Sequence, residues 1–260
     1  DAVPVSWSEL RARGWPTNIA QEDADHADDK QAWITVATTR PETYLGDTAV
    51  AINPRDPRAK SLRGLSVELP LIGRIIPIIE DDYVVLPAAM QSDPDEAAKD
   101  PKAKFATGFL KVTPAHDPND YEIGLRHNLP KINIFAPDAT ISDKHGWSDP
   151  TELKGGHKLL GLKRDDARKL VIKEFESHTV GGEGTTPLFA KSIPYRHSVK
   201  HSDRSKAIIE PYLSDQWYIK VTDGRLSGSA LAAMNPEQRS STSASIGTAT
   251  VGERKTTTTT

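Results

Sequence analysis

The chain of 260 residues contains no cysteine. Disulfide bonds, a thiolate nucleophile and a cysteine-based zinc site are therefore excluded. Aromatic residues make up only 6% of the chain, and no apolar run approaches the roughly 20 residues that a helix needs to cross a bilayer. The formal net charge is only −3, so any contact with nucleic acid must be local. The start lacks a signal-peptide pattern, and we expect a soluble, cytoplasmic protein with no membrane contact.

Hydrophobic residues make up 37% of the chain and charged residues 27%, a balance that leaves ample material for a core. We expect four regions. Residues 1–30 form a lead-in that contains an acidic, solvated loop, and residues 31–190 form the main domain. Residues 191–223 form an extended return segment. Residues 224–260 are rich in Ser, Thr, Ala and Gly and end in five threonines, a composition that predicts disorder.

Strand patterns dominate the first half of the chain. Runs of β-branched or alternating apolar residues predict strands at 33–39, 48–52, 66–69, 74–79, 83–86, 109–113 and 131–135. The runs 66–69 and 74–79 are separated by Gly73 and are typical of a hairpin. Amphipathic spacing predicts helices over 121–127 and 165–177. Strands and helices together place the chain in the α/β (α+β) class.

The most informative stretch is residues 108–122. Its first half alternates apolar and polar residues, which predicts a half-buried strand, and Pro114 ends that strand because proline lacks a backbone donor. A polar turn follows, and a helix is expected from Asp120, capped by Asp117 or Asn119. Carboxylates at the positive end of a helix are suited to binding a cation such as an ammonium group. A cap and a turn explain Asp117 almost as well.

Two long motifs occur in order along the chain. The first is Thr38-Thr39-Arg40-Pro41-Glu42-Thr43 followed by Gly46-Asp47-Thr48-Ala49-Val50-Ala51. The second is Lys111-Val112-Thr113-Pro114-Ala115-His116-Asp117-Pro118-Asn119-Asp120-Tyr121-Glu122. Shorter supporting motifs are Asp82-Tyr83-Val84, Arg126-His127-Asn128-Leu129-Pro130, and Glu210-Pro211 before Leu213-Ser214-Asp215-Gln216-Trp217-Tyr218. Together they resemble the editing (CP1) domain of the class I aminoacyl-tRNA synthetases, most closely that of the valyl branch. The glutamate at position 42 favours the valyl branch, because isoleucyl and leucyl relatives usually have Trp or Asp there.

The resemblance implies a β-barrel-like editing domain of strands with flanking helices, inserted into a synthetase. The lead-in and the return segment would join it to the catalytic domain of the parent synthetase. Motifs of the His-Ile-Gly-His and Lys-Met-Ser-Lys-Ser types do not occur here, so we expect no amino-acid activation by this chain. No cofactor is expected. No metal is expected either, because no cysteine accompanies the zinc-like spacing of His197 and His201.

The resemblance also implies roles for the polar residues of the second motif. Asp120 would hold the α-amino group of the esterified amino acid, as a catalytic residue. Asp117, also a catalytic candidate, would form the threonine-selective side of the pocket with Lys111 and Thr113. Spacing of two places Lys111 and Thr113 on one strand face. His116 is a candidate general base or substrate contact, although a buried or capping histidine explains it equally well.

Residues of the first motif would bind the end of the tRNA. Thr39 and Arg40 would contact the terminal adenosine and place the hydrolytic water, so Thr39 is a third catalytic candidate. Phe105 would pack beside that adenosine, although a lone aromatic residue is often part of a core. Thr38 and Thr43 are further substrate-binding candidates, and strand propensity alone could explain either.

The implied function is post-transfer proofreading at the acceptor end of tRNA(Val). The expected reaction is hydrolysis of the ester of mischarged threonyl-tRNA(Val) by positioned attack of water, because no Ser-His-Asp set is apparent. Two alternatives stay open. One is a non-catalytic module that binds the 3′ end of tRNA. The other is an editing domain of the isoleucyl type, which removes valine from a mischarged tRNA.

Overall fold

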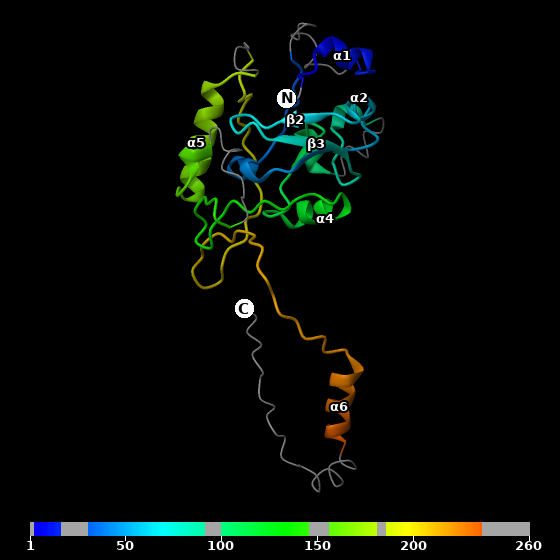
Figure 1. Ribbon diagram of the computed structural model, residues 1–260, viewed down its shortest axis with the longest axis vertical. Coiled ribbons are helices and arrows are strands. Elements are labelled where there is room, and N and C mark those ends of the chain that lie inside the picture. The colour runs from blue at the N-terminus through cyan, green and yellow to red at the C-terminus, as the bar shows by residue number, and fades with distance from the viewer. Residues whose placement is uncertain (1–2, 17–30, 92–99, 146–155, 181–185, 236–260) are drawn as a thin grey trace, which may run out of the picture. The chain divides into compact units, whose positions relative to one another are not determined.

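The computed structural model describes residues 3–16, 31–91, 100–145, 156–180 and 186–235 (Figure 1). The acidic loop predicted within residues 21–30 lies outside them. The chain divides into a larger unit, residues 1–213, and a smaller unit, residues 214–260. Every site residue named from the sequence lies in the larger unit. No helix among the described residues is long and apolar enough to cross a membrane.

A four-stranded sheet with the order β2-β3-β1-β4 forms the centre of the larger unit. Its strands are β1 (Ala49–Ile52), β2 (Ser66–Glu68), β3 (Ile75–Glu80) and β4 (Phe109–Val112). β1 is parallel to β3 and antiparallel to β4, while β2 and β3 form the predicted antiparallel hairpin. Because the described strands form an open mixed sheet, the α+β class is confirmed, but the expected barrel-like closure is absent from the part of the chain that is described.

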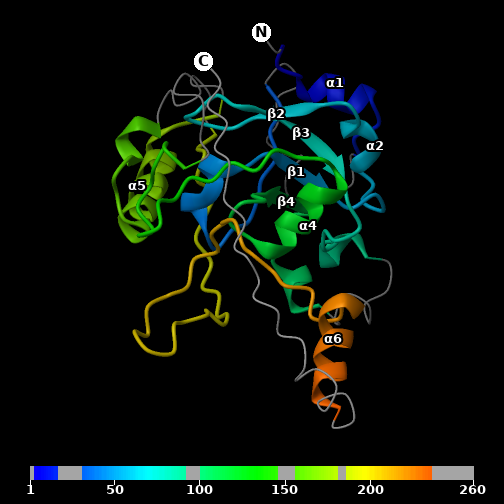
Figure 2. The ribbon, with the colours of Figure 1, turned by 60° about the horizontal axis from the view of Figure 1, so that its bottom comes forward.

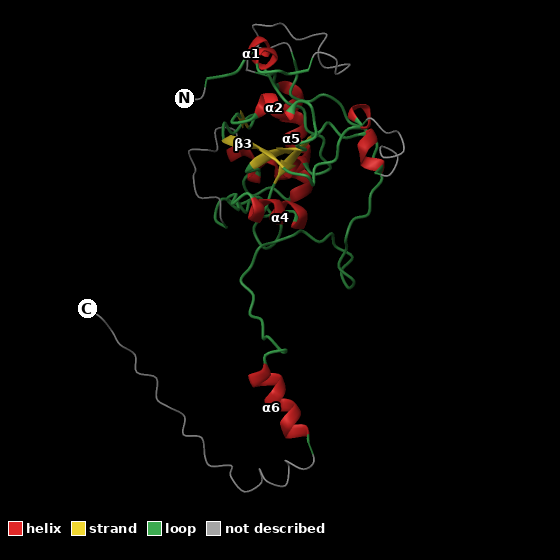
Figure 3. Ribbon diagram, turned by 90° about the vertical axis from the view of Figure 1, so that its right-hand side faces the viewer, coloured by secondary structure: helices red, strands yellow, loops and turns green. Residues whose placement is uncertain are grey.

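Helices cover the two faces and one side of this sheet. The α-helices of the larger unit are α1 (Trp7–Ala12), α2 (Ala59–Leu62), α4 (Pro118–Arg126) and α5 (Arg164–Ser177). The 3₁₀ helices are η1 (Pro41–Gly46), η2 (Ala88–Met90), η3 (Pro101–Lys104) and η5 (Gly156–Leu159). α4 lies on the opposite side of the sheet from α1 and α2 (Figures 2 and 3). The predicted helices at 121–127 and 165–177 correspond to α4 and α5.

The period-two alternation of β1 builds two apolar clusters. Val50 and Ile52 point into the larger cluster, which also contains Phe135. Ala49 and Ala51 point to the other face, where the smaller cluster includes Ile123 of α4. All of β1 is therefore buried, and the two alanines leave room for α4 to pack closely against the sheet.

Three predicted strands are not strands in the structure. Residues 33–39 and 83–86 have no regular strand, and residues 131–135 form only an isolated bridge, from Phe135 to Ile141. Several apolar side chains of these segments still pack in the core, as Ile134 and Val84 do, although Val36 is exposed. Their alternation therefore reports burial, whereas a strand also requires a neighbour with which to share hydrogen bonds.

The smaller unit contains the helix α6 (Gly224–Met234). Asp223 caps it, because its carboxylate accepts a hydrogen bond from the Arg225 backbone N–H at 2.9 Å. The helix thus lies in the segment for which composition alone predicts disorder. No side chain of α6 is buried. Residues 236–260, the rest of the low-complexity segment, lie outside the described residues.

Gly108 opens β4 with a positive φ of 86°, and a Cβ atom there would meet the buried Arg58 guanidinium and lie 2.8 Å from an Asp56 carboxylate oxygen. We expect Gly108→Ala to lower the free energy of unfolding by about 2–5 kcal/mol, from backbone strain together with displacement of this ion pair. Gly64→Ala is the matched control, because Gly64 has a φ of 74° and open space around it. Its cost should be about 1–2 kcal/mol. Urea unfolding measures both, and equal losses would contradict the packing argument.

Candidate functional site

The site lies where the end of β4, the helix η1 and the start of α4 meet. The backbone N–H of Thr48 donates to the carbonyl of Val112 at 2.9 Å, which fixes the end of η1 beside β4. Gly46 permits this approach, because a Cβ atom there would lie 2.9 Å from the Ile132 carbonyl oxygen and 3.2 Å from the Thr113 methyl carbon. The glycine of the Gly-Asp pair in the first motif is thus a packing requirement.

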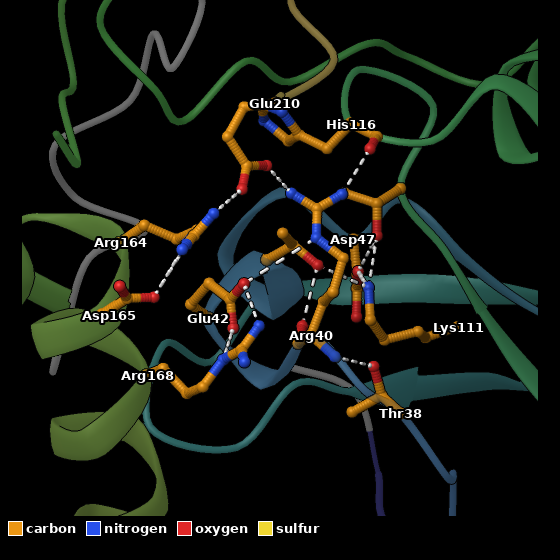
Figure 4. A network of polar contacts seen from close by, with 12 residues as sticks. Thr38, Arg40, Glu42, Asp47, Lys111, His116, Arg164, Asp165, Arg168 and Glu210 are labelled. Carbon is orange, nitrogen blue, oxygen red and sulfur yellow. Dashed lines mark hydrogen bonds and ion pairs between the residues drawn. The ribbon is translucent and has the colours of Figure 1, made fainter. Parts of the chain in front are cut away.

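A buried polar network joins β4 to η1 (Figure 4). The Lys111 ammonium donates to the hydroxyl of Thr43 at 2.9 Å and to the carboxylate of Asp47 at 2.9 Å. It also donates to the Thr113 hydroxyl, and Thr113 donates in turn to Asp47. Lys111 is only 8% exposed and Asp47 only 2%. Because an ammonium group has three donors, all of those of Lys111 are engaged within the fold.

Asp47 supplies the counter-charge for Lys111, and its role was missed from the sequence. Burial raises the pKa of Asp47, and the charge of Lys111 and the hydrogen bond from Thr113 oppose that rise. The available signal was its position in the first motif, directly after the close-packing Gly46. A buried carboxylate paired with a buried ammonium group is stable only while both partners are present.

Asp120 lies at the start of α4 and is 7% exposed. Its Oδ2 atom accepts the backbone N–H of Thr113 at 2.9 Å, and no described residue donates to its Oδ1 atom. Burial raises the pKa of Asp120 to about 6, against the opposing effects of the Thr113 N–H and the Lys111 charge. The neighbouring carboxylates of Asp117 and Asp47 add to the rise. This carboxylate therefore has one anchored oxygen and one oxygen available to a cation.

Asp117 has a different environment one turn earlier. It is the N-cap of α4, because one carboxylate oxygen accepts the backbone N–H of Asn119 at 2.8 Å and that of Asp120 at 3.3 Å. Its side chain is half-buried. Among the described residues, no donor contacts its second carboxylate oxygen. The two acidic residues of the second motif are thus close together but differently held.

His116 is completely buried between the site and the larger cluster. Its Nε2 atom accepts the backbone N–H of Ile134 at 3.0 Å, and its ring packs edge-on against Phe135. Burial lowers the pKa of His116 to about 3, and the nearby Arg40 charge adds to this effect. His116 is thus a buried histidine, as one of the two interpretations of the sequence had it, and its Nε2 atom is occupied by the backbone.

Arg40 contacts the same turn from the side of η1. Its Nη1 atom donates to the His116 carbonyl at 2.7 Å, and its Nη2 atom donates to Glu210. The hydroxyl of Thr43 donates to the Arg40 carbonyl at 3.0 Å. The contacts of Arg40 therefore connect the first motif, the second motif and the return segment.

The remaining candidates lie further out. Thr38 and Thr39 are exposed, and the Thr38 hydroxyl accepts the Arg40 backbone N–H at 3.0 Å. Phe105 is 45% exposed and packs edge-on against Tyr195. These three residues make no hydrogen bond to the buried network of Lys111 among the described contacts.

Tyr83 is a neighbour of the site that lies in a predicted strand and in a supporting motif, but no role was predicted for it. Burial raises the pKa of Tyr83, and the carboxylates of Asp117 and Asp120 are close enough to contribute to the rise. The signal for it was the supporting motif Asp82-Tyr83-Val84.

Among the described residues, no three His, Asp or Glu side chains gather as a metal site.

The comparisons with known proteins relate this α+β segment to the aminoacyl-tRNA synthetases. The chain is 41% identical over 210 residues to the valine–tRNA ligase of Bacillus cereus and 40% identical over 211 residues to that of Listeria innocua, in each case 81% of this chain and 20% of the relative. It is 45% identical over 193 residues to the valine–tRNA ligase of Protochlamydia amoebophila, which is 74% of this chain and 16% of the relative. No protein-family model matches.

Over the matched segment, the chain is thus a homologue of the valine–tRNA ligases, as the motifs predicted. It spans about a fifth of the length of the Bacillus cereus and Listeria innocua relatives. Homology over such a fragment agrees with a domain that is inserted into a longer synthetase.

The Lys111–Asp47 pair gives a stability prediction. Lys111→Met leaves the Asp47 carboxylate buried without its counter-charge, and we expect a loss of about 3–5 kcal/mol in the free energy of unfolding near neutral pH. Because the folded-state pKa of Asp47 is raised, the variant should be most stable at low pH and should lose stability as the pH rises through that pKa. Urea unfolding at pH 4.5 and at pH 7.5 measures the difference.

The control is Lys169→Met on α5, where the lysine is exposed and lies 3.4 Å from an exposed Asp166 oxygen. Its effect should stay within about 0.5 kcal/mol at both pH values. The double variant Asp47→Asn with Lys111→Met should recover much of the lost stability. A Lys111→Met protein that is as stable as the parent at pH 7.5 would contradict the buried ion pair.

Proposed function

We propose that the chain is the editing domain of a valyl-tRNA synthetase and that it hydrolyses the ester of mischarged threonyl-tRNA(Val). The proposal rests on the carboxylate of Asp120, which is nearly buried. One of its oxygens accepts the Thr113 backbone N–H, and the other is available to a cation. An α-ammonium group is the cation that every aminoacyl ester presents. The homology to a fifth of a valine–tRNA ligase supports the same substrate class.

A proofreading site is needed because threonine and valine are nearly isosteric. For this very family, the known discrimination against threonine at the synthetic site is only about a hundredfold. A second site must instead bind the hydroxyl that valine lacks. Valine in such a site leaves a buried polar group unpaired, at a cost of about 1–3 kcal/mol for each group.

The free carboxylate oxygens of Asp120 and Asp117 can bind two different groups of the substrate. Asp120 pairs with the α-ammonium group, and the free oxygen of Asp117 accepts the hydrogen bond of the threonine hydroxyl. Lys111 and Thr113 do not contact the substrate in this proposal, because their donors are already engaged with Thr43 and Asp47. Their role is to hold the end of β4, and with it the Thr113 N–H that anchors Asp120, in one geometry.

The reaction is then positioned attack of water on the ester carbonyl carbon. The bond between that carbon and the ribose oxygen breaks, the oxygen takes up a proton, and free threonine and tRNA are released. The hydroxyls of Thr43 and Thr113 donate to the Arg40 carbonyl and to Asp47, so neither is activated as a nucleophile. A neighbouring ribose hydroxyl assists, and Asp120 acts by holding the substrate in place.

Asp120→Asn removes the charge that binds the ammonium group while keeping the shape of the side chain. We expect single-turnover deacylation of threonyl-tRNA(Val) to fall by about a hundredfold or more, the loss typical of a charge-assisted contact of about 3 kcal/mol. Asp138→Asn is the matched control, because Asp138 is an exposed acid whose carboxylate accepts hydrogen bonds from Thr140 of its own turn. Deacylation by Asp120→Asn at the parent rate would contradict the proposal. Binding without cleavage by the parent chain would instead indicate a tRNA-end binding module.

The raised pKa of Asp120 predicts a pH dependence. Ionised Asp120 binds the substrate, so kcat/KM should fall as the pH drops below the free-protein pKa of about 6. Bound ammonium stabilises the carboxylate, so the fall in kcat should occur at a lower pH than the fall in kcat/KM. Deacylation rates measured between pH 5 and pH 7.5 test this. The residual activity of Asp120→Asn should not show this fall at low pH. A kcat/KM of the parent that does not change across this range would contradict the role given to Asp120.

A further inference from the structure

Glu210 of the return segment lies against the site, although 90 residues of sequence separate it from Asp120. One carboxylate oxygen accepts a hydrogen bond from the Arg164 guanidinium at 2.7 Å, and the other accepts one from the Arg40 guanidinium. The side chain of Glu210 is 12% exposed, that of Arg164 14% and that of Arg40 25%. Shielding of this kind makes charge-assisted hydrogen bonds stronger and better defined than surface pairs.

Arg40 transmits this contact to the turn that carries Asp120. Its Nη1 atom donates to the His116 carbonyl at 2.7 Å. The His116 backbone N–H donates to the Thr113 carbonyl at 3.0 Å, and the Thr113 N–H donates to Asp120 at 2.9 Å. A continuous set of hydrogen bonds therefore leads from Glu210 to the anchored oxygen of Asp120 (Figure 4 shows its first part).

A competing carboxylate explains why Arg40 needs Glu210. Glu42 is fully buried and lies 3.7 Å from the Arg40 Nε atom, and it receives two hydrogen bonds from Arg168, at 2.8 and 3.0 Å. Without Glu210, the described acid nearest to Arg40 is Glu42. The guanidinium would then be drawn towards Glu42 and away from the His116 carbonyl.

We propose that Glu210 is a positioning residue for the hydrolytic site: it holds Arg40 on the His116 carbonyl and thereby fixes residues 113–120. The consequence for hydrolysis rests on the proposed function, whereas the consequence for the turn does not. The return segment is then part of the working site as well as a connection. A chain that is cut before Glu210 would keep Asp120 but hold it loosely.

The test compares Glu210→Gln with two other variants. Glu210→Gln should lower the single-turnover deacylation rate of threonyl-tRNA(Val) by about tenfold, in kcat more than in KM, because placement of the ester is disturbed. Arg164→Met removes the other partner of Glu210 and should have a smaller effect than Glu210→Gln, because Glu210 keeps its contact with Arg40. Asp203→Asn, an exposed acid of the same segment that pairs with Lys206, should match the parent. Thermal unfolding midpoints confirm that all variants are folded.

Amide hydrogen exchange gives a readout that does not need activity. Peptides that contain residues 113–120 should exchange faster in Glu210→Gln than in the parent, in Arg164→Met or in Asp203→Asn. The double variant Arg40→Met with Glu210→Gln should be no slower in deacylation than Arg40→Met alone, since both act through one contact.

Three results would overturn the proposal: unchanged exchange in Glu210→Gln, an equal effect from Arg164→Met, or additive losses in the double variant. If the parent chain cleaves no ester, the proposed function fails, and the exchange of residues 113–120 still decides the role of Glu210.

Discussion

The buried ion pair between Lys111 and Asp47 is the interaction on which the site depends. It joins the end of β4 to the end of η1, and it orients the hydroxyls of Thr43 and Thr113. An isolated charge at either position would be very unfavourable, so the pair forces both segments into one arrangement. That arrangement places the Thr113 N–H where it anchors Asp120. The two motifs, far apart in sequence, are thus parts of one structure.

Around this pair, the charged residues differ in how completely their polar atoms are paired. Lys111 and Asp47 are buried and paired with each other, whereas Asp120 is buried to a similar extent as Lys111 but keeps one oxygen without a described donor. Arg40 and Glu210 lie nearer the surface, and in our proposal their contact fixes the turn of residues 113–120. A buried carboxylate with a raised pKa and one unpaired oxygen suits cation binding, because a rigid, poorly solvated group responds strongly to one added positive charge.

Much of this could be predicted from the sequence. The hairpin of β2 and β3, the helices α4 and α5, and the α+β class follow from local patterns, because their periodicity and turn residues agree. Residues 33–39 were misassigned, since a run rich in β-branched residues favours extended backbone but does not show that a strand partner is present. The barrel-like closure, which only the resemblance implied, is not seen among the described strands. Asp47 and Glu210 were not identified as site residues, because no local pattern encodes their contacts. Asp47 pairs with Lys111, 64 residues away in sequence, and Glu210 pairs with Arg40, 170 residues away.

We propose above all that Asp120 binds the α-ammonium group of the ester and that the free oxygen of Asp117 selects the threonyl ester by its hydroxyl. The most direct measurement compares single-turnover hydrolysis of threonyl-tRNA(Val) and valyl-tRNA(Val) by the unmodified chain, with each ester incubated without protein as the baseline. We predict that the threonyl ester is cleaved well above its baseline and that the valyl ester is cleaved at least about tenfold more slowly, as expected for one unpaired buried polar group. Equal cleavage of both esters, or preferential cleavage of the valyl ester, would contradict the claim.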